Sequence, residues 1–242
     1  MDPTQLQLRD RFQGAIIGIF LTPTAVVQAS TIPRLVAYRM SQEIARSVAA
    51  ALEQWPIAAG GGASWLFGLP LLLRYHDQSP SLRHDHIKIE LMKAGMSVDT
   101  VNMAQICGLS DILTGALRYS DDGSVAAIDY SSVTNSSRSD ALSFSQRAFT
   151  VGVSNAIAQP LTYVQAVSQA AAQATGVASP VDARLAWQAP LVASFLSGAL
   201  LGRRALPVLW QRDTRWGADE LKLKEALRIA DTIFEQWMGC LS

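Results

Sequence analysis

Apolar residues recur every three or four positions along most of the chain, which is the spacing of one helix face. The clearest case is the last stretch, where Leu223, Leu227, Ala230, Phe234 and Trp237 follow this spacing and charged side chains fill the other faces. Runs that alternate β-branched and polar residues are scarce. The pattern therefore predicts an all-α fold, closed by an amphipathic helix that docks on the core.

Prolines and glycines divide the first half of the chain into predicted helices. Pro3 suits the start of a helix that covers Thr4 to about Leu21, and Pro23 should stop or kink it. Further helices are expected over residues 33–54, 65–73 and 101–119.

The second half follows the same pattern after a polar loop at residues 131–139. Helical spacing covers residues 140–175 with a break near Pro160, and Ser179-Pro180 looks like another helix start. Pro190 should kink or end that helix. The next helix carries Gly198 and Gly202 among other small residues, which favours close helix packing inside a bundle over a membrane dimer motif.

Composition and charge limit the function classes. The 242 residues are 49% hydrophobic and only 17% charged, which suits one sizeable domain spanning residues 1–242. The net charge is zero, so we expect no nucleic-acid partner. Four nearby arginines could form a local basic patch, but a solvated helix end is the simpler interpretation: Arg203, Arg204, Arg212 and Arg215.

The apolar segment from Gly14 to Ala29 resembles an export signal only superficially. Asp2 and Asp10 cancel the charge of Arg9 and Arg11, and the segment is short for a bilayer. We expect a buried helix followed by a turn, and no membrane span. Cys107 and Cys240 show no metal-binding spacing, so a reduced, cytoplasmic location is expected, although one bridge between them stays open.

Two stretches resemble a known family. The first is Arg11-Phe12-Gln13-Gly14-Ala15-Ile16-Ile17-Gly18, and the second is Leu196-Ser197-Gly198-Ala199-Leu200-Leu201-Gly202, followed by Leu206-Pro207 and Trp210. They are similar to the opening helix and a late helix of the ADP-ribosylglycohydrolases, enzymes that remove ADP-ribose from protein side chains. A weaker similarity covers residues 40–52. The resemblance implies an orthogonal helical bundle.

The resemblance also implies a site with two Mg²⁺ ions held by aspartates from three motifs. Here these motifs fall on Thr22-Pro23, on Arg39-Met40-Ser41, and on the run that contains Ala189 and Leu191. Hydrocarbon, sulfur and a cation replace the anionic oxygens that a hard divalent ion requires. We therefore expect a vestigial cleft, no bound cofactor and no hydrolase activity of this type.

A fold can persist after its site is lost, because function resides in the site. The leading hypothesis is a non-catalytic scaffold or regulatory subunit that binds another protein, with a homo-oligomer also allowed. Its apolar former cleft could pack a partner helix. One alternative is an active hydrolase with relocated ligands, drawn from Asp77, Asp85, Asp121 and Asp122. Another is a metal-independent module that binds ADP-ribose or a nucleotide.

All three histidines, His76, His84 and His86, lie within eleven residues. On a loop, His84 and His86 could share a metal ion, whereas on a helix they would point about 200° apart. Pro80 and its polar neighbours suggest a loop, so this geometry stays open. A polar loop without metal is nevertheless the simpler interpretation.

Overall fold

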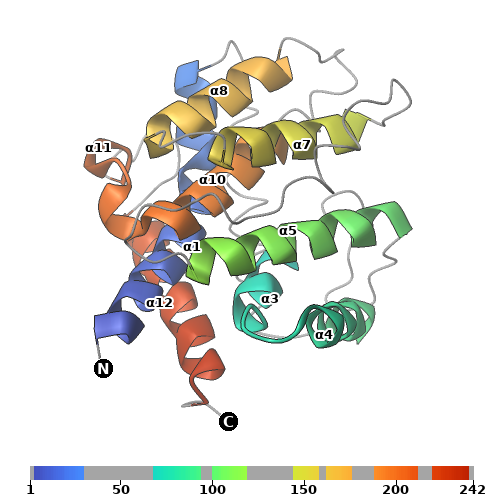
Figure 1. Cartoon of the computed structure of the whole chain (residues 1–242). Coiled ribbons are helices and arrows are strands. Elements are labelled where there is room, and N and C mark those ends of the chain that lie inside the picture. Colours follow the sequence, from blue (N-terminus) through green and yellow to red (C-terminus); the bar gives the residue numbers. More distant parts are fainter. Residues whose placement is uncertain are drawn as a thin grey trace.

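The computed structural model describes residues 3–29, 68–93, 100–118, 144–157, 162–175, 188–211 and 220–239. Within these ranges all regular structure is helical, which confirms the all-α class. Figure 1 shows α1 and α12 running steeply through the view while α5 and α7 run across it. The elements are α1 (Pro3–Ala29), α3 (Gly68–Arg74), α4 (Pro80–Lys93), α5 (Thr100–Arg118), α7 (Phe144–Ile157), α8 (Tyr163–Thr175), α10 (Gln188–Leu201), the 3₁₀ turn η4 (Arg203–Ala205), α11 (Val208–Gln211) and α12 (Glu220–Trp237).

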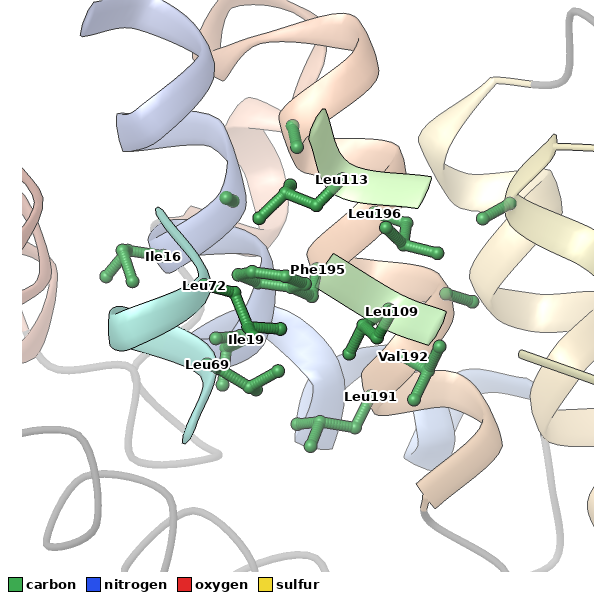
Figure 2. Packing of buried hydrophobic residues seen from close by; sticks show 14 of the residues in the cluster. Ile16, Ile19, Leu69, Leu72, Leu109, Leu113, Leu191, Val192, Phe195 and Leu196 are labelled. Carbon is green, nitrogen blue, oxygen red and sulfur yellow. The ribbon is translucent and has the colours of Figure 1, made fainter. Parts of the chain in front are cut away.

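Helix α10 is the central element of the core. Every residue from Gln188 to Ala199 is buried, and the helix packs against α1, α5, α7 and α8. Figure 2 shows Phe195 of α10 lying next to Ile19 of α1 and Leu72 of α3. A helix that is apolar on all faces is stable only when it is surrounded, so α10 depends on these four neighbours.

Helices α1 and α10 cross with their backbones in contact. A methyl group added at Gly14 would collide with the carbonyl oxygen of Gly198, and one added at Gly198 would collide with that of Gly14. One turn further along, a Cβ at Gly18 would lie 2.5 Å from the carbonyl oxygen of Ser194. The crossing therefore requires glycine at these positions, and the predicted close packing of small residues is confirmed.

The expected end of the first helix at Pro23 is wrong. Helix α1 continues through Pro23 to Ala29, although the proline cannot donate a hydrogen bond to the carbonyl one turn earlier. Residues on both sides of it, including Ile19 and Ala25, have no exposed surface. Burial of this segment outweighs a proline penalty of about 3 kcal/mol.

Pro190 lies in the first turn of α10, where its missing N–H costs no intrahelical hydrogen bond. The preceding helix that Pro190 was expected to kink or end lies outside the described residues. Helix α10 ends at Leu201, just before Gly202, whose φ of 75° is favourable only for glycine. Its N–H donates to the carbonyl of Gly198 at 2.9 Å, and the chain turns sharply into η4.

A buried arginine joins α1 to α5. The Arg11 side chain is only 6% exposed, and its Nη1 donates to the carbonyl oxygens of Ala116 and Leu117 at 3.2 and 3.0 Å. These carbonyls belong to the last turn of α5, where a positive charge is favourable. The end of α5 is thus fixed against the middle of α1.

Other predictions are confirmed in part or lie outside the described residues. Helix α5 matches the predicted helix at 101–119, α12 matches the predicted final helix, and α3 falls at the predicted 65–73 segment. Apolar side chains from α1, α3, α4, α5, α7, α8, α10 and α12 form one core, while the single-domain span of 1–242 stays a prediction. The helix at 33–54, the loop at 131–139 and the Ser179-Pro180 start are outside the described ranges. None of the described helices is both long and apolar enough to cross a membrane.

Candidate functional site: a charged groove beside the first helix

The described positions of the expected cleft lie in the interior. Thr22 of α1 and Ala189 and Leu191 of α10 have no exposed surface, and Pro23 is buried beside them. The Thr22 hydroxyl donates to the carbonyl oxygen of Gly18 at 3.3 Å, so it is engaged within its own helix. These side chains offer neither an anionic oxygen nor a surface for a partner helix.

The remaining positions of that cleft, Arg39, Met40 and Ser41, lie outside the described residues. The same is true of Asp121 and Asp122, two of the relocated ligands considered above. The other two, Asp77 and Asp85, are described, and the described part of the chain contains no group of three or more histidine, cysteine or acidic side chains arranged for a metal ion.

The expected loop covers only residues 75–79, and for His84 and His86 it is wrong. His84 and His86 lie on α4, which starts at Pro80, a favourable first helical position. The three histidines have separate partners. His76 packs its ring against Phe12, and His84 Nε2 lies 3.1 Å from Asp111 Oδ1. His86 Nδ1 lies 2.7 Å from Gln78 Oε1, so the helix does not bring the histidines to one metal position.

Cys107 is a free thiol, so it does not form the disulfide with Cys240 that the sequence left open. Partial burial raises the pKa of this thiol, and the negative charge of Asp111 raises it further. A thiol that holds its proton at neutral pH is a poor nucleophile and a poor metal ligand.

The structure instead presents a groove of about 740 Å³ at the N-terminal half of α1. It lies between this helix, α12 and the turn that follows α10. Its floor is formed by side chains three and four positions apart on α1, which share one helix face. The lining residues are Leu6, Arg9, Asp10, Gln13, Arg203, Arg204, Leu206, Val208, Leu227 and Asp231.

A chain of polar contacts crosses the groove. Arg9 donates from Nε and Nη2 to the two carboxylate oxygens of Asp231, at 2.9 and 2.7 Å. Gln13 Nε2 donates to the same carboxylate at 2.8 Å. The other side of that amide accepts a long hydrogen bond of 3.4 Å from Arg203 Nη1. Gln13 therefore links the α1–α12 ion pair to the turn after α10.

The electrostatics of this network favour its charged form. Partial burial raises the pKa of Asp231, but hydrogen bonds from Arg9 and Gln13, with the positive charges of Arg9 and Arg203, outweigh burial and leave the pKa below its usual value. The same carboxylate raises the pKa of Arg9 through its hydrogen bond. Asp231 and Arg9 thus neutralise each other and leave the remaining arginines to set the charge of the groove.

Arg203 and Arg204 keep most of their donors available. The hydrogen bond to Gln13 is the one that Arg203 makes to a described side chain, and a guanidinium has five N–H groups. Arg204 is 92% exposed, and its Nε lies 3.9 Å from Asp10 Oδ1, too far for a hydrogen bond. Between them and the core, the buried Leu206 fixes the turn, with its N–H donating to the Arg203 carbonyl at 3.1 Å.

Two apolar side chains that line the groove reach solvent: Leu6 on α1 is 54% exposed and Val208 on α11 is 59% exposed. Leu209, the next residue on α11, is outside the lining and is 81% exposed. An aliphatic residue as exposed as Leu209 gains nothing from folding, because it stays in contact with water. Together with the arginines, these side chains give a surface suited to a ligand that is both anionic and apolar.

The groove and the described positions of the expected cleft lie at opposite ends of the same helix pair. Gly14 meets Gly198 and Gly18 meets Ser194, so the chains of α1 and α10 run in opposite directions. The groove is built where α1 begins and α10 ends, whereas Thr22 and Ala189 lie toward the other end. The groove is therefore not a remnant of the cleft implied by the family resemblance.

Sequence reasoning missed most of this site. It noticed Arg203 and Arg204 but interpreted them as a solvated helix end, and it did not single out Arg9, Gln13 or Asp231. One signal was present: Leu6, Arg9, Asp10 and Gln13 form a mixed stripe at helical spacing just before the fully apolar part of α1. The partner side chains on α12, more than two hundred residues away, could not be assigned from one sequence.

Comparisons with protein-family models, curated proteins and solved structures gave no match.

Proposed function

We propose that this chain is a non-catalytic, degenerate relative of the ADP-ribosylglycohydrolases that binds another protein through the groove between α1, η4, α11 and α12. The observation that carries the proposal is the groove itself, in which Arg203 and Arg204 keep free donors beside exposed aliphatic side chains. Protein-binding surfaces combine arginine with apolar anchors in this way.

The non-catalytic part of the proposal is supported by the side chains at the motif positions. Hydrolysis in the implied family needs anionic oxygens at Thr22, Pro23, Ala189 and Leu191, where the chain has buried hydrocarbon and one engaged hydroxyl. The relation to that family rests on the sequence resemblance of the two motif stretches, which in this chain pack against each other at Gly14 and Gly198. We expect no release of ADP-ribose from ADP-ribosylated arginine peptide with Mg²⁺, and Mg²⁺-dependent release would refute this part.

Site-specific photo-crosslinking tests the protein-binding part. A benzoylphenylalanine at Leu209, the residue after the lining residue Val208, reports on partners bound at the groove, and the same group at the exposed Gln169 of α8 is the control. In extract from the native host, we expect one partner, identified by mass spectrometry at peptide level, to crosslink from position 209 and not from 169. Equal labelling from both positions, or none from 209, would contradict the proposal. A crosslink to a second copy of the chain would identify the groove as a self-interface.

A further inference from the structure

The charges of the groove point to a ligand of defined chemistry. Three arginines and two aspartates line it, so a single positive charge is left uncompensated. Arg9 is held by Asp231 through two hydrogen bonds, which places this excess on Arg203 and Arg204. A ligand that matches the groove therefore brings one negative charge at the turn after α10.

The position of Asp10 and Asp231 selects among anions. Both carboxylates face the same groove, and each would repel a second negative charge on the ligand. A diphosphate carries two or more charges and has no apolar body for the aliphatic walls. A carboxylate carries one charge, and its two oxygens suit the fork of a guanidinium.

We propose that the groove recognises a segment of the partner protein in which one glutamate or aspartate side chain is flanked by aliphatic residues. The carboxylate binds Arg203 and Arg204, and the aliphatic side chains pack on Leu6, Val208 and Leu227. This inference rests on the proposed function, because it names the chemistry of the segment that the groove would bind.

The groove is already organised for such a ligand. Gln13 orients Arg203 from α1, and the backbone bonds at Gly202 and Leu206 fix the turn on which both arginines lie. A preorganised guanidinium loses little conformational entropy on binding. Solvent exposure still weakens each charged contact, so the affinity should fall as the salt concentration rises.

Two short peptides test the inference. The first is a nonapeptide of leucine and alanine with one central glutamate, amidated at its C-terminus and labelled at its N-terminus with an uncharged fluorophore, and the second has glutamine in place of the glutamate. Fluorescence anisotropy should show at least about tenfold tighter binding of the glutamate peptide, the amount expected for charge-assisted hydrogen bonds. The double variant Arg203→Gln/Arg204→Gln should remove this preference. Arg74→Gln, which removes one positive charge at an exposed arginine on α3, away from the groove, should keep it.

The outcomes separate this inference from the proposed function. Equal binding of the two peptides, no binding of either, or an unchanged preference in the double variant would overturn the carboxylate assignment. A position-209 crosslink to a partner would still leave the proposed function intact in those cases. Competition by ADP-ribose stronger than by the glutamate peptide would overturn the assignment in favour of a nucleotide. A thermal unfolding midpoint of the double variant equal to that of the wild type establishes that the double variant is folded.

Discussion

The two halves of α1 show two different ways of holding a helix. From Gly14 to Val26 the helix is almost entirely buried, and at its crossing with α10 backbone lies directly on backbone. From Leu6 to Gln13 it faces α12 and the turn after α10 across a water-accessible groove, through ion pairs and one bridging amide. The buried half, from Gly14 to Val26, depends on shape, and its crossing tolerates no added atom. The groove-facing half, from Leu6 to Gln13, depends on charged contacts, which water and salt weaken.

The largest effect is expected from adding one methyl group to the crossing. Gly198→Ala forces the new Cβ into the Gly14 carbonyl, so α1 and α10 must separate, and stability should fall by about 3 kcal/mol or more. Gly68→Ala is the matched control, because its Cβ would lie 3.9 Å from the side chains of Ile106 and Leu91, an ordinary contact distance. Chemical denaturation of both variants measures the difference. Equal stability of the two would refute the close crossing.

A smaller effect is expected from the buried phenol beside the crossing. Tyr163 has no exposed surface and donates to the Gly18 carbonyl at 2.9 Å, so Tyr163→Phe should cost about 1 kcal/mol. Burial raises the pKa of this tyrosine. Its contribution is therefore fully present below the unfolded pKa of about 10 and is lost as the pH rises above it. The free energy of unfolding, measured by chemical denaturation from about pH 8 to about pH 11, should fall less steeply with pH for the phenylalanine variant than for the wild type.

The groove should respond more weakly and with the opposite dependence on pH. Asp231→Asn removes the ion pair with Arg9, whose partly exposed side chains limit the loss to about 1 kcal/mol or less at neutral pH. The pKa of Asp231 is lowered in the folded state. The stabilisation is thus present above the unfolded pKa of about 4 and disappears as the pH falls through the folded value. If the difference in unfolding free energy between the wild type and Asp231→Asn grew as the pH fell, this assignment would be contradicted.

The smallest effect on stability is expected from the arginines proposed to bind a ligand. Arg204→Gln removes a side chain that is 92% exposed and makes no hydrogen bond to the described residues, so the thermal midpoint should stay within about 1 °C. Leu209→Ser at the rim should behave alike, because that leucine is already in water. Differential scanning calorimetry measures both. A marked loss in either variant would mean that these residues serve the fold and are not kept for a partner.

Sequence predicted the fold class and the crossing well, because both follow from local spacing. The apolar period marks α12, and the small residues around Gly198 identify a close contact without naming its partner helix. Pro23 predicts a helix end that does not occur, because surrounding burial keeps α1 helical despite the lost hydrogen bond. Pro80 predicts a loop, whereas it lies at the start of α4.

The groove was harder to predict for a physical reason. Its charge pattern depends on Arg9 meeting Asp231 and on Gln13 meeting Arg203, contacts between segments about two hundred residues apart in the chain. Counting charges along the sequence gives a net of zero and hides which arginine is neutralised. Only the arrangement of α1, α12 and the turn after α10 shows where the uncompensated charge lies.

The glycine contact between α1 and α10 has a kinetic consequence for any encounter at the groove. Two helices touching through their backbones cannot slide without first moving apart, so Gln13 and Arg203 stay at a constant spacing. A ligand would therefore meet a groove that is already in its binding-competent conformation. Its association should follow a single exponential whose observed rate rises in proportion to ligand concentration, with no plateau set by a slow rearrangement of the protein.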